Sequence, residues 1–310
     1  MSNYAFGVDI GGTTVKMGFF TKEGKLEDKW EIKTDTSNGG ANILEDIAVS
    51  IEEFLAKKGL TKDDIFGVGI GCPGPVNKEG IVNKCANLGW GVTPAKEIME
   101  KRLGVHAEIG NDANVAALGE LWQGGGKGFG DMIMLTLGTG VGGGVAVDGK
   151  LVVGANGAGG EIGHMNVNPS ETRTCGCGGK GCLEQYASAT GMARLAKEAL
   201  EKYSGTSTLS STEVTAKDLW DGVKAGDELS VQVAEYICDI LGRAMANMAV
   251  VTNPGVFVIG GGVSKAGTVL TDMIAKGFEK YAFHACTDTK INLATLGNDA
   301  GMYGCVRMLL

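Results

Sequence analysis

One histidine and three cysteines lie close together near the middle of the chain, and their side chains are those that bind zinc. The order is His164, Cys175, Cys177, Cys182, which gives the spacing H-x10-C-x-C-x4-C with glycines between the cysteines. Cys175 and Cys177 are too close in sequence to form a comfortable disulfide. Three thiolates and one imidazole make the closed tetrahedral set of a structural zinc ion. The cluster therefore predicts a Zn²⁺ site without an open position for water, whose role is to fix a loop.

Three glycine-rich turns follow apolar runs and are suited to binding phosphate. They lie at residues 11–14, 138–144 and 260–262. Glycine lets backbone N–H groups converge on an anion, and threonine hydroxyls add donors. The second turn can be aligned with G-x-G-x-x-G, but it leads into a predicted strand rather than a helix and so lacks the context of a dinucleotide motif. Each turn alone fits an ordinary hairpin equally well, whereas three in one chain favour phosphate binding.

An Asn-Asp pair stands where a predicted strand ends and a predicted helix begins. Asn111 and Asp112 precede the helix 113–122. An aspartate at this position commonly caps a helix, because its oxygens accept from the N–H groups of the first turn. The capping-box partner is missing, since Val115 lies three residues after Asp112. Position alone therefore favours a structural cap.

The apolar pattern places these residues on alternating strands and helices. Strands are predicted at 4–10, 15–20, 29–34, 66–72, 105–110, 131–137, in a stretch ending at 147, and at 256–259 and 291–296. Helices are predicted at 41–58, 94–102, 113–122, 188–203, 228–251, 266–280 and from 299 onward. Strand, Gly/Thr turn and strand occur in that order twice. We therefore predict a mixed α/β protein with a duplicated core and a ligand cleft between its halves, although two independent hairpins would give the same pattern.

Composition and charge exclude several classes of protein. Of the 310 residues 44% are apolar and 21% charged, which excludes a disordered chain. The 28 basic and 36 acidic residues give a net charge of −8, so we expect no nucleic acid as a partner. No apolar run approaches a membrane-spanning length, and the N-terminus lacks the pattern of a signal peptide. We therefore expect a cytoplasmic protein that does not interact with membranes and keeps its other cysteines reduced.

Six segments together resemble the ROK family of bacterial sugar kinases, and within it the glucokinases. They are DIGGTTVK (9–16), NDAN (111–114), LGTGVGGG (137–144), GGEIGH (159–164), CGCGGKGCLE (175–184) and IGGGVS (259–264). The resemblance covers essentially the whole chain. It implies a duplicated ribonuclease-H-like fold, similar to actin and hexokinase, with two domains and a nucleotide in the cleft between them. We expect a small domain at 1–115, completed by the C-terminal helix 298–310, and a large domain at 116–297 that carries the zinc loop.

The resemblance also implies how ATP and Mg²⁺ are bound. The residues implied at the ATP phosphates are Asp9, Gly11, Gly12, Thr13, Thr14, Gly138, Thr139 and Gly140, and those implied at the adenosine are Gly260, Gly261 and Gly262. Asp9 would lie on the magnesium side and act through water, the alternative being an aspartate that only stabilises the turn. Lys16 is a weaker candidate for a phosphate contact, because a lysine at the start of a strand is commonly a solvated edge charge.

A sugar site and a catalytic base follow from the same resemblance. The expected sugar contacts are polar side chains that can bind adjacent hydroxyls, namely Asn87, Asn111, Asp112, Glu161, His164 and Glu184. Asp112 matches the general base of the family, which takes the proton of the sugar 6-hydroxyl as that oxygen attacks the γ-phosphorus. His164 would bind zinc with one ring nitrogen and a sugar hydroxyl with the other. The implied reaction is the ATP-dependent conversion of glucose to glucose 6-phosphate.

Other functions share parts of this pattern. A ROK kinase for N-acetylglucosamine, N-acetylmannosamine, mannose or fructose would carry the same motifs. A sugar-responsive ROK repressor would have an additional N-terminal helix-turn-helix, which a first strand near residue 4 does not accommodate. An actin-like filament protein would have no use for a zinc loop beside a sugar pocket. We therefore expect an enzyme, in a homodimer or homotetramer, and the apolar stripe of helix 228–251 fits either the core or a dimer interface.

Overall fold

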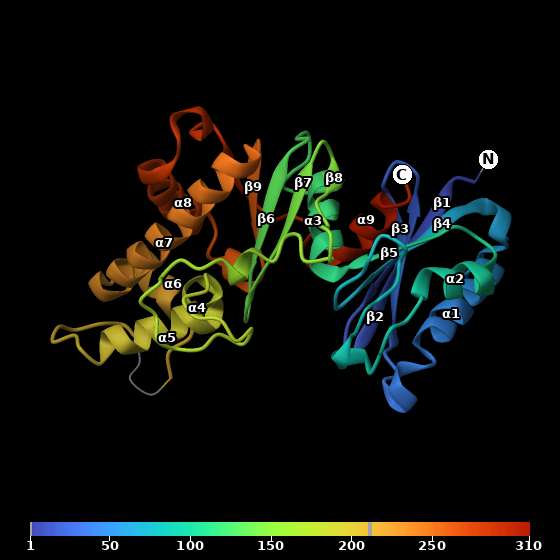
Figure 1. The fold of residues 1–310 in the computed structure, drawn as a ribbon, viewed down its shortest axis with the longest axis horizontal. Helices are drawn as coiled ribbons and strands as arrows, with labels where there is room; N and C mark the ends of the chain where they lie inside the picture. The colour runs from blue at the N-terminus through green and yellow to red at the C-terminus, as the bar shows by residue number, and fades with distance from the viewer. Residues whose placement is uncertain (1, 210–212) are drawn as a thin grey trace. The chain divides into compact units, whose positions relative to one another are not determined.

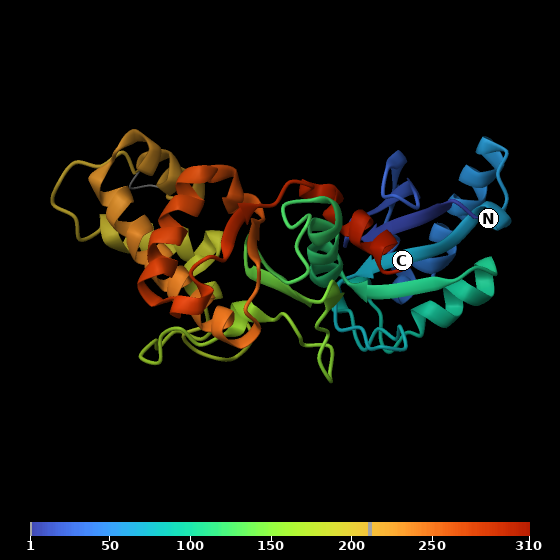
Figure 2. The same ribbon diagram turned by 90° about the horizontal axis from the view of Figure 1, so that it is seen from above.

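The computed structural model describes residues 2–209 and 213–310, which form two compact units (Figures 1 and 2). The first unit extends to Gly128 and includes Gly149–Gly159 and Asn298–Leu310, so the C-terminal segment returns to it. The second unit comprises Phe129–Asp148 and Gly160–Gly297. Each sheet of the protein has five strands and combines parallel with antiparallel pairs.

The first sheet has the strand order β3-β2-β1-β4-β5. Its strands are β1 (Tyr4–Ile10), β2 (Thr14–Thr21), β3 (Leu26–Lys33), β4 (Ile65–Cys72) and β5 (Ala107–Asn111). The hairpin partners β1 and β2 are antiparallel, whereas β1, β4 and β5 are parallel. The helices of this unit are α1 (Ile43–Lys58), α2 (Ala95–Leu103), α3 (Asp112–Gln123) and α9 (Ala300–Arg307). Because parallel strands end at one edge, the residues that follow β1, β4 and β5 are brought together there.

The second sheet repeats this plan in the order β10-β9-β6-β7-β8. Its strands are β6 (Met132–Leu137), β7 (Val141–Val147), β8 (Lys150–Leu151), β9 (Val256–Gly260) and β10 (Lys290–Leu293). Again a hairpin, here β6 and β7, is extended by parallel strands, here β9 and β10. The helices of the second unit are α4 (Glu184–Ala187), α5 (Ala189–Leu200), α6 (Ala216–Ala225), α7 (Glu228–Thr252) and α8 (Thr268–Tyr281). The predicted α/β fold with a duplicated hairpin core is confirmed.

Helix α7 carries the apolar stripe that, from the sequence, fits either the core or a dimer interface. Ala234, Ile237, Leu241 and Met245 are buried in the core of the second unit. The stripe is therefore core. Among the described residues, no helix has the length and apolar character that crossing a membrane requires.

Helix α6 and the short strand β8 are missing from the sequence-based prediction. Only Leu219, Trp220 and Gly222 of α6 are buried, so its apolar stripe is too sparse to detect by periodicity. Its ends carry clearer signals. Thr215 and Asp218 form a capping box at the start, and Gly226 adopts a left-handed conformation with φ of 76° after the end.

Helix α9 packs directly against the backbone of its neighbours in the first unit. A Cβ atom added at Gly304 would overlap the carbonyl oxygen of Val115 in α3. One added at Gly69, in β4, would overlap the carbonyl oxygen of Cys305. The Cys305 thiol donates a hydrogen bond to the carbonyl oxygen of Val8 at 3.1 Å, which ties the helix to β1 as well. This close approach requires glycine, because any side chain would separate the two backbones.

We expect Gly304→Ala to lower the free energy of unfolding by about 3 kcal/mol, since the added methyl meets rigid backbone and cannot rotate away. Gly91→Ala is a matched control, because a Cβ atom there has no neighbour within 4 Å. Urea unfolding followed by circular dichroism measures both. Equal unfolding midpoints for the two variants would contradict the close packing of α9.

Candidate active site and metal centre

The four predicted metal ligands come together in the second unit. His164 ends the 3-10 turn Ile162–His164, and the three cysteines follow between residues 175 and 182. Their ligand atoms all lie within 4.8 Å of one another, and the Sγ atoms of Cys177 and Cys182 are 3.7 Å apart. A tetrahedral zinc ion with Zn–S bonds of about 2.3 Å places two sulfurs about 3.8 Å apart. The residues therefore fit a zinc ion.

The two ring nitrogens of His164 face different groups. Nδ1 lies 4.0 Å from the sulfur of Cys175, and Nε2 lies 3.9 Å from a carboxylate oxygen of Glu161. Nδ1 is thus the nitrogen on the side of the thiols. Both side chains are accessible to solvent, at 38% for His164 and 59% for Glu161. Nε2 is therefore able to hydrogen bond outside the metal cluster.

The loop around the cysteines is shaped for ligand binding by its glycines. Gly178 and Gly181 have φ angles of 87° and 70°, a region that favours glycine. The N–H group of Gly179 donates to the sulfur of Cys177 at 3.4 Å and holds the pKa of that thiol below its usual value. Burial raises the pKa of Cys182 to about 12, so this thiol gives up its proton only to a cation that replaces it.

In the first unit, Asn111 rather than Asp112 caps helix α3. Asn111 has an extended backbone, and its side-chain oxygen accepts from the N–H group of Asn114 at 3.2 Å. The interpretation of Asp112 as the cap is therefore wrong, because Asp112 is the first residue of the helix. Its Oδ1 accepts from the N–H group of Ala113 at 2.8 Å and from Nδ2 of Asn111 at 3.0 Å. The carboxylate is held at the positive end of the helix dipole.

Asp9 lies at the same edge of the first sheet as Asp112. Asp9 is paired with Gly71 of β4, whose neighbour Cys72 is paired with Asn111 at the end of β5. Burial raises the pKa of Asp9, the charge of Lys16 lowers it, and the charge of Asp112 raises it further. The two carboxylates are thus close enough for their charges to interact.

Helix α9 limits the space around Asp9. A Cβ atom added at Gly301, in the first turn of the helix, would lie 2.9 Å from Cγ of Asp9. Lys16, paired with Asp9 across the hairpin, donates to the carbonyl oxygen of Asn298 at 3.2 Å. Lys16 is half-buried, and its amine makes this hydrogen bond at an exposed position.

The first glycine turn is closed by backbone hydrogen bonds. The N–H group of Gly11 donates to the carbonyl oxygen of Thr14 at 2.9 Å. Thr34, which the sequence analysis did not single out, donates from its hydroxyl to the carbonyl oxygen of Gly11 at 2.7 Å. Gly12, Thr13 and Thr14 are exposed. The turn therefore presents its tip to solvent while its base is fixed.

The second and third glycine turns adjoin each other in the second unit. Thr136 of β6 is paired in register with Gly260 of β9, so both parallel strands end at one edge. Gly261 has a φ of 81°, and a Cβ atom there would overlap the carbonyl oxygen of Leu137. This contact places the backbone of the third turn directly on the base of the second.

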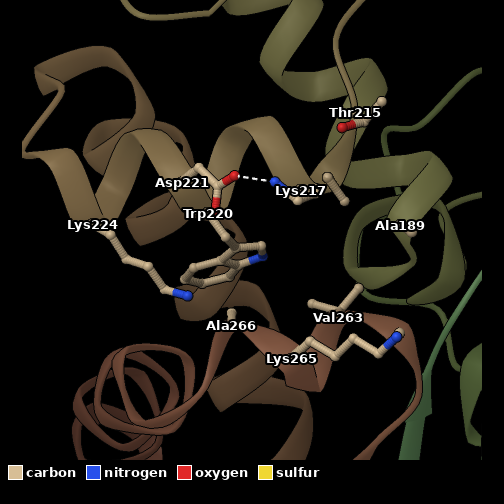
Figure 3. Close-up of a pocket in the computed structure, with 11 residues that line it drawn as sticks. Ala189, Thr215, Lys217, Trp220, Asp221, Lys224, Val263, Lys265 and Ala266 are labelled. Carbon is tan, nitrogen blue, oxygen red and sulfur yellow. Dashed lines mark hydrogen bonds and ion pairs between the residues drawn. The ribbon is translucent and has the colours of Figure 1, made fainter.

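A pocket with a volume of about 350 Å³ opens beside the third turn (Figure 3). Figure 3 shows side chains of α6 on one side and those of the segment after β9 on the other. The lining residues are Ala189, Thr215, Ala216, Lys217, Trp220, Asp221, Lys224, Gly262, Val263, Lys265 and Ala266. Nε1 of Trp220 is buried and has no hydrogen-bond partner within the described part of the chain. The volume is that of a small-molecule site.

Of these lining residues, only Gly262 was predicted from the sequence. Those of α6 were missed because this helix was not predicted, and its capping box was the available signal. The predicted sugar contacts divide between the units. Asn87, Asn111 and Asp112 belong to the first unit, whereas Glu161, His164 and Glu184 belong to the second.

We expect the purified protein to carry about one zinc ion per chain, measured by inductively coupled plasma mass spectrometry. Cys177→Ala removes one of four ligands and is expected to lower the zinc content to nearly zero, because a closed structural site needs its full ligand set. Cys238→Ala is the control, since Cys238 is buried in the core of the second unit and is not a member of the cluster. Retention of zinc by Cys177→Ala would contradict the assignment.

Asp9→Asn is expected to raise the melting temperature at neutral pH in the absence of nucleotide and magnesium. The pKa of Asp9 is raised in the folded protein, so ionisation costs folding free energy at any pH above the ordinary value near 3.9 and costs none well below it. Scanning calorimetry should therefore show a gain at pH 7 that diminishes toward pH 4. The control Asp63→Asn, at an exposed position of the same unit, should show no such gain. A loss of stability in Asp9→Asn at pH 7 would contradict the buried-charge argument.

Comparison with known proteins agrees with these features. A model of the ROK family matches residues 5–310. A glucokinase of Halalkalibacterium halodurans is 43% identical over 304 residues, which cover 96% of this chain and 92% of that protein.

Two solved structures extend the likeness to the fold. The structure of a ROK hexokinase from Thermus thermophilus is 30% identical, with a TM-score of 0.81 and coverage of 98% of this chain and 96% of that chain. A ROK family glucokinase from Streptomyces griseus, solved in complex with glucose and AMPPNP, is 32% identical, with a TM-score of 0.72 and coverage of 98% of both chains. These matches confirm the predicted actin-like two-domain α/β fold. The chain belongs to the ROK family.

Proposed function

We propose that this protein is an ATP-dependent glucokinase that transfers the γ-phosphoryl group of ATP to the 6-hydroxyl of glucose. The observation that carries the proposal is the pair of carboxylates beside the first glycine turn. Asp112 is held at the N-terminus of α3, and Asp9 lies at the same sheet edge next to the turn 11–14. The glucokinases among the relatives support a sugar kinase, and the choice of glucose is part of the proposal.

Asp112 acts as the general base in this proposal. It accepts the proton of the 6-hydroxyl while that oxygen bonds to the γ-phosphorus and the bond from phosphorus to the departing oxygen of ADP breaks. The transition state of phosphoryl transfer is loose, so the attacking oxygen gains little charge early and the proton moves late. A carboxylate is therefore a sufficient base. Asn111 orients it, because Nδ2 of Asn111 donates to Oδ1 of Asp112.

Asp9 is the proposed carboxylate on the magnesium side. Its environment suits a cation, since it is half-buried and close to a second carboxylate. A magnesium ion bound through water would neutralise charge on the ATP phosphates. Polyphosphate would contact the same glycine turns as the phosphates of ATP. The proposed preference for ATP therefore rests on the pocket beside the third turn, which offers a surface for the adenosine.

The nucleotide would contact both glycine turns of the second unit. Its phosphates would meet Gly138, Thr139 and Gly140, and its adenosine would lie against Gly260, Gly261 and Gly262. The pocket lined by Trp220 and Val263 offers apolar surface for the base.

The proposed sugar contacts are the polar groups described within each unit. Asn87 is exposed in the first unit, and Glu161 and His164 are exposed in the second. Glu184 would meet the sugar with a carboxylate of which one oxygen already accepts from the N–H group of Val141. A cytoplasmic location, where ATP is available and thiols stay reduced, is part of the proposal.

Asp112→Asn is expected to lower the turnover number by roughly 10²–10⁴, the usual scale for the loss of a general base. Asparagine has the same shape, and its carbonyl oxygen still accepts from the N–H group of Ala113, so glucose affinity should change much less. Steady-state ADP release and glucose titration by calorimetry separate the two effects. A turnover within tenfold of the unchanged protein would contradict the role of Asp112.

The same assay across hexoses tests the substrate. ADP release with ATP and magnesium is measured for glucose, mannose, fructose, N-acetylglucosamine and N-acetylmannosamine. Turnover on glucose above all others supports the proposal. A preference for another sugar would keep the mechanism and replace the substrate, whereas sugar binding without turnover would indicate a sensor.

A further inference from the structure

The second glycine turn is held by hydrogen bonds from one short segment of the chain. The backbone N–H group of Ala189 donates to the carbonyl oxygen of Gly138 at 2.7 Å. The hydroxyl of Thr190 donates to the carbonyl oxygen of Thr139 at 3.0 Å. Both donors belong to the start of α5, so two successive carbonyl groups of the turn point toward this helix.

Glu184 completes the contact from the other end of the segment. Its Oε2 accepts from the N–H group of Val141 at 3.0 Å, the first residue of β7. A Cβ atom at Gly140 would overlap this oxygen, so the carboxylate lies directly against the turn. We use the name clamp for residues 184–190, which contact the turn through Glu184, Ala189 and Thr190.

The clamp fixes the direction of the N–H groups that matter for anion binding. A peptide unit is planar and trans, so its C=O and N–H bonds point in opposite directions. Holding the carbonyl of Gly138 toward α5 therefore turns the N–H group of Thr139 away from it. Holding the carbonyl of Thr139 toward α5 likewise turns the N–H group of Gly140 away from this helix. Two successive N–H groups on one side of a turn form the concave donor site that binds phosphate.

The clamp begins where the metal loop ends; metal loop is the name for residues 164–182, which carry the four predicted ligands. Cys182 is a predicted ligand, and its N–H group donates to the side chain of Gln185 at 3.1 Å. Gln185 in turn donates to the carbonyl oxygen of Arg173 at 3.1 Å, which lies before the first ligand cysteine. The Oε1 atom of Glu184 lies 3.6 Å from the sulfur of Cys175. The start of the clamp is therefore fastened to the metal loop by two hydrogen bonds of the Gln185 side chain.

We propose that Thr190 is a positioning residue for the nucleotide phosphates and that the clamp links the metal centre to the phosphate-binding turn. The metal loop then orders the nucleotide site as well as the sugar site. Without the hydroxyl of Thr190, the peptide unit between Thr139 and Gly140 loses the hydrogen bond to its carbonyl oxygen and presents its N–H group to phosphate in fewer molecules. This inference rests on the proposed binding of ATP phosphates by the second turn.

The direct test compares Thr190→Val with Thr190→Ser. Both variants keep a small side chain at an exposed position, but only serine keeps the hydroxyl. The affinity for ADP is measured by isothermal titration calorimetry, together with the KM values for ATP and glucose. We expect the valine variant to bind ADP about fivefold more weakly, the effect of losing one hydrogen bond, with glucose KM and melting temperature unchanged. The serine variant should match the unchanged protein.

The outcomes separate this inference from the proposed function. If the wild-type protein neither binds ADP nor phosphorylates any hexose, the proposed kinase function is wrong. Normal function with equal ADP affinity in the valine and serine variants would overturn the role of Thr190 alone. A fall in ADP and glucose affinity together, with a lower melting temperature, would indicate a general loss of structure and would also overturn it.

A second measurement addresses the metal link. ADP affinity is compared between zinc-loaded protein and protein depleted of zinc, with the metal content measured on the same samples. The clamp predicts weaker ADP binding after depletion and recovery when zinc is added back. Unchanged ADP affinity in protein shown to lack zinc would disprove the link, while the valine and serine pair would still decide the role of Thr190.

Discussion

The close approach of backbone to backbone, which glycine alone permits, is the constraint on which this structure depends. Helix α9 touches α3 through Gly304 and β4 through Gly69, and it reaches Asp9 through Gly301. These contacts join elements that are far apart in the sequence. The parallel pairing of β1, β4 and β5 brings the carboxylates of Asp9 and Asp112 to the sheet edge beside this helix. The end of the first unit that carries Asp9 and Asp112 therefore packs closely against α9 because these glycines have no side chains.

That arrangement carries an electrostatic cost. Asp9 is half-buried, desolvation raises its pKa, and the charge of Asp112 raises it further. A fold selected for stability alone would not gather two carboxylates in this way. The cost becomes intelligible if a cation and a proton acceptor are both needed there, because binding of magnesium relieves the repulsion and catalysis uses the base. The electrostatic cost at Asp9 and the proposed function of the two carboxylates thus have one physical origin.

A sequence is most informative where a residue type has few structural uses. Three cysteines and a histidine at short spacing have little to do except bind a metal, and their ligand atoms do converge. Repeated hairpins around glycine turns likewise led to the correct fold. The cap of α3 was misassigned because Asn111 and Asp112 are both good capping residues, and the choice depends on backbone angles that the sequence does not display.

Positioning residues were missed for a different reason. Thr34 and Thr190 are ordinary threonines in the sequence, and their importance lies in one hydrogen bond each to a carbonyl oxygen of a glycine turn. Such a contact is set by tertiary packing and leaves no local pattern. Trp220 was overlooked with the rest of α6, whose buried face consists of a few residues only. The sequence therefore predicted the metal-binding residues, whereas the contacts that hold the glycine turns could not be predicted from it.

The two glycine turns differ in how they are held, and the difference bears on the role of the metal. The first turn is closed by its own backbone and by Thr34, which belongs to the same sheet region. The second turn is also closed by its own backbone, through the N–H group of Gly138 and the carbonyl oxygen of Gly140. Its outward carbonyl groups are held in addition by the clamp, which continues from a glycine-rich and largely exposed loop. A loop of that composition loses much conformational entropy when it is ordered. Metal coordination supplies free energy that offsets this loss, so a structural zinc ion is needed most where the chain itself offers the fewest contacts.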